Sequence, residues 1–184
     1  NATLTTIGQA FRLLGLINVS QNKLRLNEKA FKLQFAEKSG TCDAAFTGET
    51  YTDVTTSSLI AFNDNATPID GANLTANAND PTNGFNVIVN QDYEELNNFT
   101  TTVSPILAGQ DGKWDFSLID NGAPSATSYC FRVVESTGTL LSSYTVVPEI
   151  TTANSFCPAP VTSFPYTQGF EGSIGDWVQS AADD

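Results

Sequence analysis

The sequence predicts an all-β fold, namely an antiparallel β-sandwich of seven to eight short strands followed by an extended C-terminal tail. Residues 125–147 provide the clearest observation, because they read as strand, tight turn and strand. Tyr129, Phe131 and Val133 fall on one face of the first strand, since successive strand side chains point in opposite directions. Gly138 supplies the turn. In addition, no window has a helical period beyond two turns, and Gly, Asn, Asp and Pro separate the alternating apolar runs.

The first half of the chain contains several further strand candidates. In the first run, Phe11 and Leu13 share one side, and in the third run Phe31, Leu33 and Phe35 share the inward face. These candidates are residues 10–19, 24–26, 30–36, 51–54 and 58–62. The polar stretch that follows, rich in Pro, Gly and Asn up to residue 83, is expected to be a long loop.

The second half adds two strand candidates and two turns before the closing hairpin. Residues 85–90 are expected to form a strand, and residues 93–99 either one helical turn or an edge strand. Asp111-Gly112 and Asn121-Gly122 are expected turns, and they flank a strand at 113–120. On that strand the alternation points three large apolar side chains inward: Trp114, Phe116 and Leu118.

The number and spacing of these strands favour an immunoglobulin-like or fibronectin-like sandwich. An up-and-down or jelly-roll barrel is the alternative. We assign residues 1–150 to the β-sandwich module, residues 151–163 to a linker and residues 164–184 to an extended tail. The last thirty residues of the chain carry more aromatic surface than they can bury alone. The tail is therefore expected either to pack on the sandwich or to belong to structure beyond this chain.

Composition restricts the chemistry that the chain can perform. There is no histidine, so a serine–histidine or cysteine–histidine nucleophile pair is impossible within the chain. We expect a protein that is not an enzyme. The net charge of −12 disfavours nucleic-acid binding, and no apolar run reaches the roughly 20 residues needed to cross a bilayer. The charge is uneven, because residues 1–38 carry +4 and residues 39–184 carry −16.

The three cysteines suggest a disulfide and an oxidising compartment. Cys130 is expected to point away from the core, because its neighbours Tyr129 and Phe131 occupy the core face. Cys42 follows the strand at 30–36, which lies beside the strand of Cys130 in a fibronectin-like order. We therefore expect a Cys42–Cys130 bridge, with reduced thiols or a bridge to Cys157 as the alternatives.

Several stretches between residues 8 and 152 resemble a repeat module of large predicted cell-surface proteins of uncultivated bacteria. Those stretches are Gly8–Leu13, Phe31–Cys42, Gly109–Leu118 and Tyr129–Val134. The resemblance implies an extracellular, cell-surface location and a sandwich fold, and members of that family begin with a further strand that this chain lacks. Residues 129–133 also resemble the sixth strand of fibronectin type III domains, although the cysteine directly after Tyr129 departs from the antibody pattern. Residues 164–177 look like the opening of a bacterial MAM-type domain, a family associated with adhesion.

Acidic side chains offer two kinds of candidate site. Asp64, Asp70 and Asp80 are candidate calcium ligands in polar loops, although no EF-hand spacing is present and Asp also favours turns for local reasons. Calcium is the only cofactor that the sequence suggests. A pair of carboxylates for glycoside hydrolysis is the second kind, but Glu94, Glu95 and Asp111 lie near expected turns, where solvated carboxylates are ordinary, and no spacing selects a catalytic pair. The candidates are Asp92, Glu94, Glu95, Asp111 and Asp115.

An absent first strand would leave an open sheet edge, which is able to pair with another chain. The tail has an extended, alternating, aromatic pattern, so it is a candidate strand donor. Its candidate residues are Phe164, Tyr166, Phe170 and Trp177. We therefore expect a structural or adhesion module whose partners are further copies of itself or neighbouring surface-protein domains, with filament assembly as one outcome. A passive fragment whose tail packs or dangles, and a carbohydrate- or ligand-binding module, are the alternatives.

Overall fold

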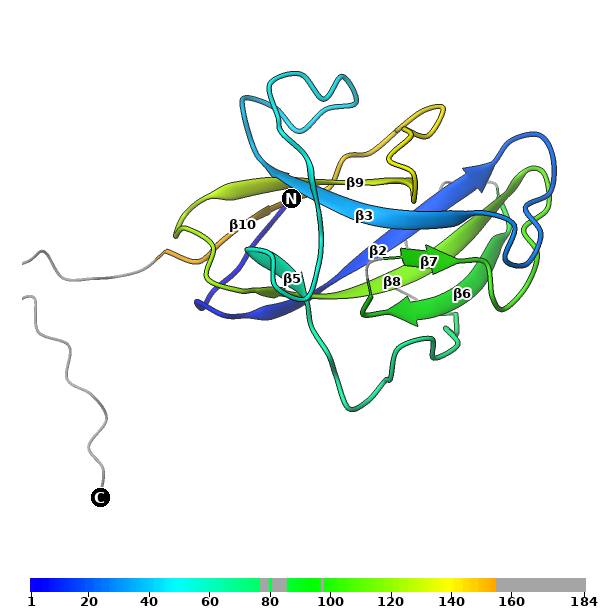
Figure 1. The fold of residues 1–184 in the computed structure, drawn as a ribbon, viewed down its shortest axis with the longest axis horizontal. Helices are drawn as coiled ribbons and strands as arrows, with labels where there is room; N and C mark the ends of the chain where they lie inside the picture. The colour runs from blue at the N-terminus through cyan, green and yellow to red at the C-terminus, as the bar shows by residue number, and fades with distance from the viewer. Residues whose placement is uncertain (77–79, 81–85, 97, 155–184) are drawn as a thin grey trace, which may run out of the picture. The chain divides into compact units, whose positions relative to one another are not determined.

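A computed structural model describes residues 1–76, 80, 86–96 and 98–154, and it confirms the predicted β-sandwich (Figure 1). Two open sheets pack face to face, and Figure 1 shows the strands of one running diagonally to those of the other. The larger sheet contains β1 (Ala2–Thr3), β3 (Ala30–Glu37), β4 (Thr52–Asp53), β7 (Asn98–Thr100), β9 (Ser128–Glu135) and β10 (Glu149–Thr151). The smaller sheet contains β2 (Ala10–Val19), β5 (Ile60–Phe62), β6 (Ile88–Glu94) and β8 (Gln110–Asp120).

The strand order is that of an immunoglobulin-type sandwich. The path β10-β9-β3-β4 corresponds to the order G-F-C-C′, and the path β2-β8-β5 corresponds to B-E-D. Two pairings depart from the expected antiparallel pattern, because β1 joins β10 and β6 joins β8 in parallel. The described residues form ten strands, more than the seven to eight predicted. The additional ones are the two-residue strands β1 and β4 and the strands β6 and β7, which lie between β5 and β8 in the sequence.

The core lies between the sheets and is rich in aromatic side chains. Trp114, Phe116 and Leu118 of β8 are at most 1% exposed, which confirms the predicted inward face. Phe99 of β7 packs against both rings, with centroids 5.3 Å from Trp114 and 5.0 Å from Phe116. Edge-to-face and tilted contacts of this kind add to the hydrophobic stabilisation of burial. The compact unit extends from Asn1 to Asn154.

The predicted closing hairpin is wrong in its second half. After β9 the chain turns at Gly138, but only Leu140 forms a bridge back to β9, at Val134. The reason lies with Tyr144, whose hydroxyl donates to the carbonyl of Val133 (2.6 Å) and accepts from the amide of Leu141 (3.0 Å). A side chain thus takes the carbonyl that a second strand would have used. The strand that does pair with β9 is β10, at Ser128–Cys130.

Two further expectations need correction. Asp111-Gly112 is not a turn but part of β8, and the turn lies earlier, where Gly109 has φ +82°. Gly112 is required for packing, because a Cβ there would overlap the side chains of Ile106 and Trp114. Residues 24–26 form no strand, since Leu24 makes only an isolated bridge with Ile106.

The segment between β5 and β8 contributes one strand to each sheet. Residues 93–99, expected to be a helical turn or an edge strand, contribute the end of β6 in one sheet and the start of β7 in the other. The described part of the predicted loop lies beside β6: the amide of Tyr93 donates to the carbonyl of Ala72 (2.9 Å), and that of Gly71 donates to Tyr93 (2.8 Å). No helix in the described ranges is long and apolar enough to span a membrane.

Candidate functional site

The structure contains the expected Cys42–Cys130 disulfide, with the two Cα atoms 5.4 Å apart. Cys130 lies on the face of β9 opposite to Tyr129 and Phe131, and it is nevertheless fully buried. The bridge ties the segment after β3 to the outer face of the larger sheet. Cys157, the third cysteine, lies outside the described residues.

An arginine holds the same segment from the neighbouring position on β9. The Arg132 guanidinium lies 3.9 Å from the ring centroid of Tyr51 and 4.9 Å from that of Phe46. Its Nε donates to Gln34 (3.0 Å), and the ring of Tyr144 meets Phe46 edge-on at 4.8 Å. Burial, followed by the charge of nearby Glu49, raises the pKa of Tyr51 to about 12. This cation–π cluster and the disulfide together fasten the segment to the sheet.

The five carboxylates considered for glycoside hydrolysis are buried, which corrects the expectation that Glu94, Glu95 and Asp111 are solvated near turns. They are Asp92, Glu94, Glu95, Asp111 and Asp115, none more than 6% exposed. Three of them accept bonds from within the fold. Asn65 donates its backbone amide to Glu95 (2.8 Å), Asn18 donates to Asp111 (2.7 Å), and Arg12 donates to Asp115 (2.9 Å). These contacts give the three carboxylates a role in holding the fold.

Asp92 and Glu94 form a buried carboxyl pair on β6. Burial raises the pKa of Glu94 to about 9, and the charges of Asp92 and Asp70 add to the shift. Burial likewise raises the pKa of Asp92, although the hydrogen bond from Thr102 opposes the rise. At neutral pH Glu94 is therefore protonated, which makes its carboxyl a hydrogen-bond donor toward Asp92.

The three calcium candidates do not come together. Asp64 is exposed, Asp70 accepts the backbone amide of Glu95 (2.8 Å), and Asp80 forms an ion pair with Lys113 (2.6 Å). Within the described ranges, no group of three or more acidic, cysteine or histidine side chains is placed to hold a metal ion.

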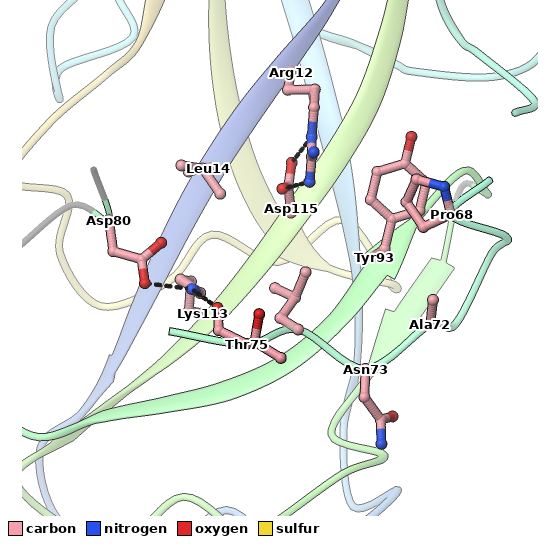
Figure 2. A pocket seen from close by; sticks show the side chains of 11 residues that line it. Arg12, Leu14, Pro68, Ala72, Asn73, Thr75, Asp80, Tyr93, Lys113 and Asp115 are labelled. Atoms are coloured by element: carbon pink, nitrogen blue, oxygen red, sulfur yellow. Dashed lines mark hydrogen bonds and ion pairs between the residues drawn. The ribbon is translucent and has the colours of Figure 1, made fainter. Parts of the chain in front are cut away.

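A pocket of about 440 Å³ lies on the outer face of the smaller sheet (Figure 2). The floor comes from β2, β6 and β8, and the wall comes from the loop before β6. Its lining residues are Arg12, Leu14, Pro68, Ala72, Asn73, Leu74, Thr75, Asp80, Tyr93, Lys113 and Asp115.

Both cations of this pocket are engaged by carboxylates, as Figure 2 shows. Arg12 forms a two-pronged ion pair with Asp115 and lies 5.0 Å from the ring centroid of Tyr93. Lys113 is 2% exposed and donates to Asp80 (2.6 Å) and to the carbonyl of Thr75 (3.2 Å). The lysine is therefore a buried cation whose charge is compensated locally.

Replacing Arg12 with glutamine should destabilise the sandwich by about 2–3 kcal/mol, because it leaves the buried Asp115 without its cation. Arg25→Gln is the matched control, because Arg25 is exposed and its replacement removes the same positive charge. Urea unfolding of both variants at pH 7 measures the difference. Equal stability of the two variants would show that the Arg12–Asp115 pair contributes nothing.

A larger groove, of about 1040 Å³, runs along β2 on the opposite flank. In the part of the chain that the structure describes, no strand pairs with the second edge of β2. This is the position that strand A occupies in the immunoglobulin order. Leu13 and Ile17 line the groove on one side, core rings form its floor and the segment 140–148 forms its far wall. Beneath it lie the buried residues Phe31, Leu33, Phe116 and Phe131, and its partly exposed apolar lining includes Leu13, Ile17, Val133 and Leu141.

The free edge of β2 presents regularly spaced backbone groups. The amide of Asp120 donates to the carbonyl of Gln9 (3.2 Å), which places the odd-numbered residues in hydrogen-bonded pairs with β8. Even-numbered residues, such as Leu14 and Leu16, therefore direct N–H and C=O groups toward the free edge. Their side chains lie on the outer face, opposite to the inward face of Leu13.

Among the described residues β2 thus has an open edge, as expected. The candidate donor residues Phe164, Tyr166, Phe170 and Trp177 lie outside the described part of the chain. Sequence reasoning missed the Arg132 cluster and the buried pairs of Lys113 and Glu94. Lys113 gave one available signal, because it is one of only two cations after residue 38 and lies inside an apolar strand.

No family model, curated protein or solved structure matches this chain.

Proposed function

We propose that this protein is a non-enzymatic structural or adhesion module of an extracellular surface, and that it accepts an extended strand along β2. The single observation that carries the proposal is the edge of β2 that no other described strand pairs with, which borders a groove with partly exposed apolar side chains such as Leu13 and Ile17. An added strand would satisfy the free backbone groups and cover the partly exposed side chains of Leu13 and Ile17. Backbone pairing supplies affinity in this mode, and alternate side chains entering the groove supply selectivity.

An extracellular location is supported by the disulfide. Bridges of this kind persist in oxidising compartments and are rare where thiols are kept reduced. The acidic net charge, with few lysines after residue 38, suits a soluble surface module.

The outer-face pocket gives weaker support to a carbohydrate- or ligand-binding module. Tyr93, the only aromatic side chain among the described residues of its lining, is 1% exposed beneath Arg12, so its ring does not offer a stacking face. Both cations there are already paired with carboxylates. The groove along β2 combines unpaired backbone with apolar surface, which is why strand acceptance is the function we favour.

Replacing Leu16 with proline tests the proposal. Proline removes an N–H that points to the free edge, and it spares the bonds to β8, so it should block strand addition while the sandwich still folds. We expect the purified chain to form assemblies whose size grows with concentration in sedimentation velocity and electron microscopy. Leu16→Pro should remain monomeric.

Leu16→Thr is the matched control, because it alters the same side chain but keeps the amide and the strand preference. It should assemble like the parent chain. The proposal fails if the parent chain stays monomeric at high concentration. It also fails if Leu16→Pro, shown to be folded by its thermal transition, assembles as well as Leu16→Thr.

A further inference from the structure

We propose that residues 69–74 form a strap over the outer edge of β6, and that ionisation of the buried carboxyl pair Asp92 and Glu94 releases this strap. The strap lies along the side of β6 that does not pair with β8. Its release frees that edge to pair with an added strand, so pH controls a second acceptor edge of the sandwich. The inference is independent of the β2 edge, because it concerns another strand and another set of contacts.

Backbone hydrogen bonds hold the strap along β6. The amide of Gly71 donates to the carbonyl of Tyr93 (2.8 Å), and the amide of Tyr93 donates to the carbonyl of Ala72 (2.9 Å). The amide of Leu74 donates to the carbonyl of Gln91 (2.8 Å). Figure 2 shows Ala72 in the chain segment that runs beside Tyr93. The strap therefore occupies the hydrogen-bonding positions that a further strand would use.

Contacts on either side of the strap hold its two ends. Before it, Asn65 donates its backbone amide to Glu95 (2.8 Å) and its side-chain amide to the hydroxyl of Tyr93 (2.5 Å). After it, the carbonyl of Thr75 accepts a hydrogen bond from Lys113 (3.2 Å). The strap is thus a short stretch between two anchors, and it can leave β6 and return without displacement of the rest of the chain.

Little apolar burial holds the strap itself. Ile69 is 64% exposed, and Asp70, Gly71 and Asn73 are exposed as well. The adjoining residues 91–95 of β6 and its end are buried. Segments with few buried apolar contacts open at the lowest free energy. The strap, and not β6, is therefore the part that moves when the neighbouring carboxyls require water.

The carboxyl pair has no cation to compensate a second negative charge. Asp92 and Glu94 are 2% and 6% exposed, and in the part of the chain that is described neither forms an ion pair with Lys or Arg. The charge of Asp70, on the strap, also acts on Glu94. Strand β8 places the uncharged Phe116 opposite Glu94, and the hydroxyl of Thr102, after β7, donates to Asp92. Ionisation of both carboxyls therefore brings three negative charges together, one of them on the strap.

The proton on Glu94 decides whether this arrangement is stable. While Glu94 keeps the proton, its carboxyl donates toward Asp92 and the pair carries a single charge. Burial raises the pKa of Glu94 to about 9, and the charges of Asp92 and Asp70 add to the rise. Once the proton is lost, the carboxylates repel one another, and release of the strap admits water to them. Between the ordinary pKa of 4.5 and about 9, the open form gains up to about tenfold per pH unit.

Amide hydrogen exchange on the full chain, followed by NMR at pH 6 and at pH 8, tests the strap. The reporter amides, which all bond between the strap and β6, are those of Gly71, Leu74, Tyr93 and Glu95. Their protection, corrected for the intrinsic exchange rate, should fall by about tenfold or more from pH 6 to pH 8. At both pH values they should be less protected than the amide of Val54, which bonds to Leu33 in the larger sheet and opens with the whole fold.

Two variants make the test specific to the carboxyls. Glu94→Gln keeps a hydrogen-bond donor toward Asp92 but has no proton to lose, so the reporter amides should keep the same protection at both pH values. Asp70→Asn, at an exposed position, keeps an oxygen for the amide of Glu95 and removes the charge of the strap. Its fall in protection should be smaller than that of the parent chain. Glu37→Gln, at an exposed carboxylate on β3, is the matched control and should behave like the parent chain.

Two results would overturn the inference. One is a protection of the reporter amides that does not change with pH in the parent chain, or that falls equally in the parent chain, Glu94→Gln and Asp70→Asn. The other is a protection equal to that of Val54 at both pH values, which would show that the strap leaves β6 only when the whole sandwich unfolds.

Discussion

Replacing both Cys42 and Cys130 with serine should lower the free energy of unfolding by about 4–5 kcal/mol. The two cysteines lie 88 residues apart, so the bridge closes a long loop and removes much of the conformational freedom of the unfolded chain. A typical domain is stable by only about 5–15 kcal/mol, and the loss is therefore a large fraction of the total.

Urea unfolding monitored by Trp fluorescence, with Trp114 in the core as a reporter, measures this loss. Cys157→Ser is the matched control and should leave the midpoint unchanged, because it removes a thiol but not the bridge. A loss below about 1 kcal/mol in the double variant would mean that the unfolded chain is already compact, or that the Arg132 cluster fastens the segment without the bridge.

The sequence predicted the fold well where alternation is strong. In β8, Trp114, Phe116 and Leu118 alternate without interruption, and their burial follows directly from the two-residue period of a strand. The Cys42–Cys130 bridge was predictable for the same reason, since the alternation of β9 fixes the direction of Cys130 and the sandwich order places β3 beside it. Local pattern and common topology were sufficient for both.

Predictions failed where a distant side chain decided the backbone. Residues 139–147 alternate like a strand, yet Tyr144 captures the Val133 carbonyl and prevents a second ladder. Asp111-Gly112 has the composition of a turn, but Gly112 is needed because Ile106 and Trp114 approach it closely. In both cases tertiary contacts override a local preference.

The candidate sites were less predictable than the fold. The acids at 92–95 look solvated in sequence because polar residues surround them, and their burial results from the segment 71–74 pairing with β6. β6 itself pairs with β8 in parallel, with a bulge between Asn90 and Tyr93. Neither the parallel pairing nor the bulge has a recognisable sequence signal. The free edge of β2 was foreseeable only through the family resemblance, whose members have a further first strand, because an edge strand and a central strand have the same sequence pattern.

The buried Glu94 should make the protein lose stability as pH rises through the neutral range. Its pKa is raised from 4.5 to about 9, chiefly by burial and then by Asp92 and Asp70, so the folded chain holds a proton that the unfolded chain releases. The stabilising contribution is complete below about pH 4.5 and is lost progressively as pH rises toward 9. The slope from this one group is at most about 1.4 kcal/mol per pH unit.

Glu94→Gln isolates that slope, because glutamine keeps the shape and a hydrogen-bond donor toward Asp92 but has no proton to lose. Between pH 5 and pH 8 the variant should lose about 4 kcal/mol less than the parent chain, measured by urea unfolding at each pH. Glu37→Gln, at an exposed carboxylate on β3, should follow the parent curve. Since the comparison uses slopes, it holds even if the amide changes stability equally at every pH. Parallel curves for the parent and Glu94→Gln would mean that Glu94 is ionised in the folded chain, and that water reaches the interior between β6 and β7.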